Sequence, residues 1–144
     1  MSGKKTIEEI LSSDGKYVST TVGFSMKPLF HDRRDTIIIL PKSSRLKKYD
    51  VPLYRVGESY ILHRIIKVLP DSYVIRGDNC KDKEFGISDE QIIGVLHSFY
   101  RKDKYGEVSS LGYRVYSVLI VAAHPFIWAC RWVRSSVSRL LKRK

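Results

Sequence analysis

Residues 23–30 read Gly23-Phe24-Ser25-Met26-Lys27-Pro28-Leu29-Phe30, and the expected fold is arranged around this stretch. Ser25 has a glycine two positions before it and a proline three positions after it. Glycine permits backbone torsions that other residues avoid, and proline fixes the direction in which the chain leaves. This composition predicts a sharp turn that holds the Ser25 hydroxyl in one orientation. Taken alone, it also fits a strand-to-turn junction with an incidental serine.

A second stretch favours chemistry at that serine. A lone histidine lies in an apolar run that we interpret as a buried strand, Tyr60-Ile61-Leu62-His63-Arg64-Ile65-Ile66. A serine becomes a nucleophile when a base lies within hydrogen-bond reach, and the unperturbed pKa of histidine suits that role near neutral pH. Ser25 and His63 therefore indicate a nucleophile and its general base.

The rest of the chain predicts a mainly β protein. Short runs rich in β-branched and aromatic residues alternate with turn signals, which favours a small coiled antiparallel β-barrel or sheet. We expect strands at 16–22, 36–40, 49–55, 60–69, 73–76 and 92–96. The apolar strand at 36–40 is predicted to be buried on both faces. The basic segment 42–48 is predicted to be a solvated loop.

The two ends of the chain are expected to be helical. Thr6 and Glu9 form a capping-box pattern at the start of a short N-terminal helix that ends at Asp14-Gly15. From Phe126, apolar residues recur at spacings of three and four with basic residues on the other side, which predicts an amphipathic helix. The sequence thus divides into an N-terminal helix at 1–15, a β domain at 16–105 and a basic helical tail at 106–144.

Charge is concentrated in that tail. The chain of 144 residues has a formal net charge of +11, and no acidic residue follows Val108. Such asymmetry points to an anionic partner. A basic amphipathic helix flanked by Trp128 and Trp132 suits an anionic membrane surface, contacted through residues 113–144. The alternative is a helix that docks on its own β domain. A specific nucleic-acid partner is not expected.

The sequence shows no targeting signal and no cofactor motif. No signal peptide is expected, and no clear transmembrane helix, because His124, Pro125 and Arg131 interrupt the nearest apolar stretch at 116–133. Two cysteines, Cys80 and Cys130, form neither a metal pattern nor a disulfide framework. We therefore expect no metal and no cofactor, and a protein that is cytoplasmic or peripherally membrane-associated.

Six segments in order resemble the serine peptidase superfamily that contains type I signal peptidases and LexA-type repressors. The segment around Ser25 resembles the nucleophile box, and Leu62-His63-Arg64-Ile65-Ile66 resembles the box that carries the general base. The other four resemblances lie at Arg34–Ile38, Lys47–Tyr54, Arg76–Asn79 and Ile92–Val95. A histidine at the base position resembles the serine–histidine branch, and the chain is also similar to small signal-peptidase-like proteins of Gram-positive bacteria.

The resemblance implies a fold and a set of roles. It implies a serine endopeptidase that cleaves signal or leader peptides through an acyl-enzyme, with Ser25 as nucleophile and His63 as base. The backbone around Ser25, between Gly23 and Met26, would supply the oxyanion and substrate contacts. The acid that orients His63 would be Asp78 or Asp82, and the alignment leaves both open.

The sequence also leaves two other functions open. A domain of this fold can bind an extended peptide along a sheet edge without cutting it. A LexA-like self-cleaving regulator is the other alternative, although the 22 residues before Gly23 are too few for a helix-turn-helix module.

Overall fold

The computed structural model describes residues 3–142 and confirms a mainly β chain with a helix near each end. Its elements are α1 (Ile7–Asp14), β1 (Tyr17–Thr20), β2 (Thr36–Pro41), β3 (Pro52–Val56), β4 (Ser59–Leu62), β5 (Arg64–Val68), β6 (Tyr73–Arg76), β7 (Glu84–Ile87), a 3-10 turn η1 (Asp89–Gln91), β8 (Ile92–Arg101), β9 (Lys104–Glu107) and α2 (Leu111–Leu141). The predicted capping box is present, because Thr6 and Glu9 exchange side-chain to backbone hydrogen bonds.

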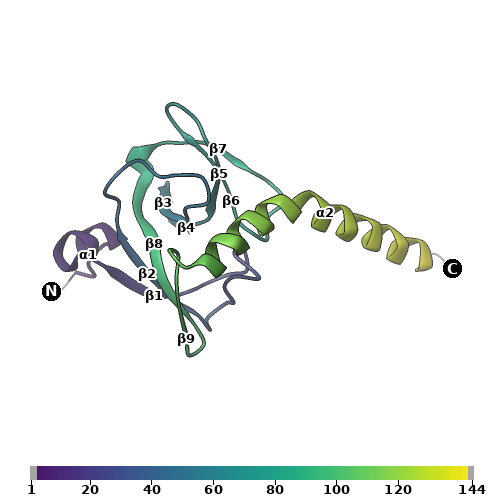
Figure 1. Ribbon diagram of the computed structural model, residues 1–144, viewed down its shortest axis with the longest axis horizontal. Coiled ribbons are helices and arrows are strands. Elements are labelled where there is room, and N and C mark those ends of the chain that lie inside the picture. The colour runs from purple at the N-terminus through teal and green to yellow at the C-terminus, as the bar shows by residue number, and fades with distance from the viewer. Residues whose placement is uncertain (1–2, 143–144) are drawn as a thin grey trace.

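The strands form two antiparallel sheets that curl into a half-barrel (Figure 1). The larger sheet has the order β1-β2-β8-β3-β4, with β9 paired to β8, and the smaller one has the order β5-β6-β7. The expected single strand at 60–69 is in fact two strands in different sheets. Only His63 separates β4 from β5, so the histidine lies where the chain passes between sheets.

Two apolar clusters fill the interior. The larger one joins α1 and the Ser25 turn to the first sheet, and its members include Leu11, Met26, Phe30, Ile39 and Leu96. The second lies under the smaller sheet, around Tyr54, Ile65, Tyr73 and Ile75. Because Met26 and Phe30 are 5% and 2% exposed, the chain on the C-terminal side of Ser25 is anchored in the core.

Strand β2 is buried on one face rather than on both. Ile37 and Ile39 are 6% and 0% exposed, whereas Ile38 and Leu40 are half-buried. Alternate residues of a strand point to opposite faces, and only one face of this sheet is covered by the main core. The uninterrupted apolar run at 36–40 therefore overstated the burial of β2.

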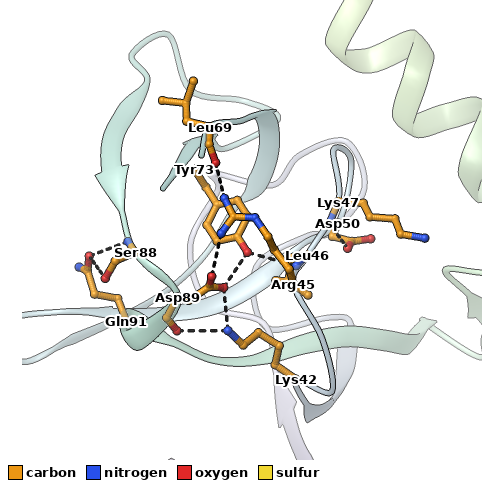
Figure 2. A network of polar contacts seen from close by, with 10 residues as sticks. All are labelled: Lys42, Arg45, Leu46, Lys47, Asp50, Leu69, Tyr73, Ser88, Asp89 and Gln91. Carbon is orange, nitrogen blue, oxygen red and sulfur yellow. Dashed lines mark hydrogen bonds and ion pairs between the residues drawn. The ribbon is translucent and has the colours of Figure 1, made fainter. Parts of the chain in front are cut away.

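The basic loop at 42–48 is anchored to the protein body by Asp89 (Figure 2). The Asp89 carboxylate accepts from Lys42 Nζ at 2.7 Å, from Arg45 Nη1 at 3.0 Å and from the Tyr73 hydroxyl at 2.7 Å. Arg45 also donates to the carbonyl of Leu69. The predicted loop is present and mostly exposed, and two of its cations also form ion pairs.

Helix α2 begins well before the amphipathic segment expected from Phe126. It runs unbroken from Leu111 to Leu141, with Ser110 as N-cap and Pro125 inside it. Its first half packs on the β domain and its second half projects away from it (Figure 1). By length and composition α2 could cross a membrane, and 11% of its most apolar window is buried. The sequence pattern had not indicated a clear span.

Candidate active site

The Ser25 turn connects β1 to β2 and is fixed at both ends. Gly23 has a φ of 90°, a left-handed conformation that favours glycine. Its N–H donates to Asp32 Oδ1 at 2.7 Å, so the connecting loop holds the start of the turn. On the other side Met26 is buried in the core. The sharp turn predicted from the sequence is therefore present, with Ser25 half-buried between two fixed residues.

The loop after β6 lies directly against this turn. The backbone N–H of Asn79 donates to the Ser25 carbonyl at 2.8 Å, and Asn79 Nδ2 donates to the Phe24 carbonyl at 3.0 Å. These two bonds hold the backbone on both sides of the Phe24–Ser25 peptide. The polar loop at 77–80 thus positions the serine.

His63 is oriented by Glu84 and Tyr54. His63 Nδ1 lies 2.8 Å from Glu84 Oε1, and the Tyr54 hydroxyl donates to the same oxygen at 2.7 Å. The Tyr54 oxygen is also 3.2 Å from Nδ1. Because a carboxylate only accepts, Nδ1 carries the proton and Nε2 is left as a proton acceptor. This is the tautomer that a general base requires.

Burial supports this arrangement. The His63 and Glu84 side chains are 12% and 33% exposed, and Tyr54 is completely buried. Burial, followed by the hydrogen bond and charge of Glu84, raises the pKa of Tyr54 well above its ordinary value. Tyr54 therefore stays protonated near neutral pH and donates to Glu84.

Gly77 lies next to both Ser25 and His63. A methyl group at Gly77 would lie 2.7 Å from the Ser25 carbonyl oxygen and 3.1 Å from His63 Cδ2. Both residues therefore border the same glycine. Within residues 3–142 no hydrogen bond joins Ser25 Oγ to His63; such bonds often tighten only when substrate is bound.

Neither predicted aspartate contacts His63 in the described structure. Asp78 forms a bidentate ion pair with Arg64 at 2.7 and 2.8 Å, and both side chains are almost fully buried. Asp82 is exposed. Successive residues of an extended chain point to opposite sides, so the carboxylate that neutralises Arg64 is turned away from His63. Glu84, which sequence reasoning missed, occupies the expected position instead.

A pocket of about 250 Å³ extends from Ser25. Its walls come from β1 and the residues that follow it, including Thr21 and Gly23, and from β4, including Tyr60 and Leu62. These are the two edge strands of the larger sheet, which the curl brings to opposite sides of the pocket. Unpaired strand edges can hydrogen-bond to an added extended peptide.

Other reactive groups near the site are unsuited to replace the serine. Cys80 lies beside the Ser25 carbonyl, but burial raises the pKa of its thiol, which keeps it protonated. In the part of the chain that the structure describes, no three His, Cys, Asp or Glu side chains are grouped to hold a metal ion. Ser25 and His63 remain the candidate nucleophile and base.

Comparisons of this chain with protein-family models, with curated proteins and with solved structures give no match. The site must therefore be judged on its own geometry.

The tight contacts of Gly77 make it a sensitive position. Gly77→Ala is expected to lower any Ser25-dependent activity by roughly 10²-fold, because shifts of about 1 Å at a reacting group cost that much. The added methyl must displace a backbone oxygen of Ser25, which cannot move freely. Gly112→Ala is the matched control, since no atom lies within 4 Å of the added group. Equal activity of both variants would contradict the contact.

Proposed function

We propose that this chain is a serine endopeptidase of the serine–histidine type that cleaves signal or leader peptides. The observation that carries the proposal is His63, which is held by Glu84 and Tyr54 in the base tautomer beside the Ser25 turn. The ordered sequence segments that resemble the signal peptidase and LexA superfamily add support, and so does the curled antiparallel sheet.

The proposed reaction is acyl transfer. Ser25 Oγ attacks the scissile carbonyl carbon while His63 Nε2 takes its proton, and the Glu84 carboxylate stabilises the imidazolium through Nδ1–H. The peptide C–N bond then breaks as His63 returns the proton to the leaving amine. Water, deprotonated by His63, attacks the acyl-enzyme and releases Ser25. The backbone N–H of Ser25 is the proposed donor to the oxyanion.

The pocket indicates how the substrate would bind. An extended peptide placed between β1 and β4 can pair with either strand edge and direct alternate side chains into the pocket beside Ser25. The pocket volume of about 250 Å³ and the apolar side chains of Met26, Ile37 and Leu62 suit small or apolar residues before the cut. The resemblance to the signal peptidase superfamily implies a preference for small residues near the cut site, with which this pocket is consistent.

Peptide binding without cleavage is the second candidate. The same pocket and strand edges would serve it, and the lack of a Ser25–His63 hydrogen bond within residues 3–142 leaves room for it. The pairing of His63 with a carboxylate favours catalysis, because binding alone requires no oriented base. A LexA-like regulator has no specific structural observation in its favour.

Cleavage of leader-like peptides by the native protein and by Ser25→Ala tests the proposal. We expect the native protein to cut a subset of a peptide library and Ser25→Ala to cut none, while both bind the same peptides. Thr20→Ala serves as a control for hydroxyl loss, since it removes the hydroxyl of another residue that lines the pocket. Binding by both proteins without cleavage by either would favour the non-catalytic alternative.

A further inference from the structure

Helix α2 carries apolar side chains along the side that faces away from the β domain. Its contacts with the domain include those of Tyr113, Ser117, His124 and Arg131, which recur at helical spacing on one side. The opposite side, here named the outer face, carries exposed apolar residues along nearly the whole helix: Leu111, Val115, Val118, Leu119, Phe126, Val133, Val137, Leu140 and Leu141. Their side chains are 46% to 77% exposed.

The outer face is a continuous apolar surface rather than a set of scattered apolar residues. At 1.5 Å per residue, α2 is about 46 Å long, and the apolar stripe follows it from one end to the other. Soluble proteins rarely leave continuous apolar surface of this size uncovered. No described segment of this chain covers it, and the second half of α2 projects beyond the domain (Figure 1).

Charge identifies the partner as an anionic bilayer. Arg114, Arg134 and Arg139 lie beside the outer face at exposed helical positions, and no acidic residue follows Val108 in the sequence. Two such helices packed face to face would bring like charges together, whereas anionic lipid headgroups would neutralise them. Trp128 and Trp132 add side chains that favour the boundary between headgroups and acyl chains.

Geometry favours a helix that lies in the interface over one that crosses the bilayer. The first half of α2 is fixed to the domain, where Arg64 Nη1 donates to Ser117 Oγ at 2.7 Å and His124 Nε2 lies 2.7 Å from the Cys80 carbonyl. The sixteen residues from Phe126 to Leu141 span only about 24 Å, less than the roughly 30 Å of a hydrocarbon core. They also contain three arginines.

We propose that the outer face of α2 lies in the interface of an anionic membrane, with the β domain on the aqueous side. This membrane contact deepens the proposed function and rests on it in one respect. Arg131 Nη2 donates to Asn79 Oδ1 at 2.9 Å, and Asn79 bonds the Phe24 and Ser25 carbonyls. The membrane-bound helix is therefore two hydrogen bonds from the serine, which places the site where a membrane-associated leader peptide can reach it.

Flotation of the full chain with vesicles tests the docking without any substrate. We expect binding to vesicles of phosphatidylcholine and phosphatidylglycerol in equal parts, and at least tenfold weaker binding to phosphatidylcholine alone. Phe126→Glu and Leu119→Glu should each weaken binding about tenfold or more, because each removes a large apolar group and adds a charge of the wrong sign. Phe85→Glu is the matched control, since Phe85 is 69% exposed but lies on β7.

Three outcomes would overturn the proposal. One is no binding to anionic vesicles by a folded protein, and a second is equal loss from Phe85→Glu and Phe126→Glu. The third is a dimer in sedimentation that Phe126→Glu abolishes, without vesicle binding, which would make the outer face an interface between copies. Ser25→Ala should bind vesicles like the native protein, so a failure of docking and a failure of catalysis are distinguishable.

Discussion

Replacing His63 by Ala is expected to reduce peptide cleavage by at least about 10³-fold in kcat/KM, because the proposed general base is lost. Glu84→Gln should cost roughly 10²- to 10⁴-fold, since the amide no longer fixes the base tautomer of His63. Tyr54→Phe should cost about tenfold, because it removes one neutral hydrogen bond to Glu84 and leaves the ring packed.

Glu90→Gln is the matched control for Glu84→Gln, because it makes the same chemical change at an exposed position on η1. Its activity should stay within twofold of the native value. Steady-state kinetics on a peptide selected from the library would measure all four variants. If Asp82→Asn lost more activity than Glu84→Gln, the orienting role would belong to Asp82, and Glu84 would not be the residue that orients His63.

Removing either partner of the Arg64–Asp78 pair is expected to destabilise the protein by about 3 to 5 kcal/mol, because the other charge is left buried without a partner. The two side chains are 0% and 2% exposed. Arg64 also donates to Ser117, and Asp78 accepts from the Tyr116 hydroxyl at 2.9 Å. Loss of the pair should therefore also loosen α2 from the domain.

Urea unfolding of Arg64→Ala and Asp78→Asn measures the first effect, and limited proteolysis within α2 measures the second. Arg55→Ala is the control, because its pair with Glu8 is 42% and 38% exposed and should contribute about 0 to 1 kcal/mol. The double variant Arg64→Met with Asp78→Leu should recover much of the lost stability. An Arg64→Ala protein as stable as Arg55→Ala would contradict a buried structural pair.

The sequence predicted those features that depend on neighbouring residues. The capping box at Thr6 and Glu9 and the turn at Ser25 are both local patterns, and the structure contains each of them. The antiparallel, curled β class followed from short strands separated by turn signals.

The features that were missed depend on contacts between distant segments. Glu84 reaches His63 only because β7 pairs with β6. Strand β7, which contains Gly86 at a φ of 72°, was not predicted from the sequence. The break at His63 arises from the change of sheet, which no local pattern marks. Helix α2 continues through Pro125, and its first half is held by Arg64 and the loop at 77–80.

Asp78 illustrates how a motif can mislead. It follows a glycine in a polar loop after a strand, which matched the expected position of an orienting acid. The neighbouring Arg64 had to be buried with a counter-charge, and Asp78 supplies it. Arg64 directly follows His63 in a run that was expected to be buried, and a buried arginine requires a counter-charge. This alone was a reason to look for a different carboxylate near His63.

Covalent labelling of Ser25 by a fluorophosphonate tests the central claim most directly, because the reagent needs an activated serine and no knowledge of the substrate. Intact-mass and peptide mass spectrometry should find one adduct, on Ser25, in the native protein. Labelling should be absent in Ser25→Ala and slowed by at least about 10²-fold in His63→Ala, since the base activates the hydroxyl. A folded native protein that takes up no label, or that is labelled equally fast without His63, would contradict the account.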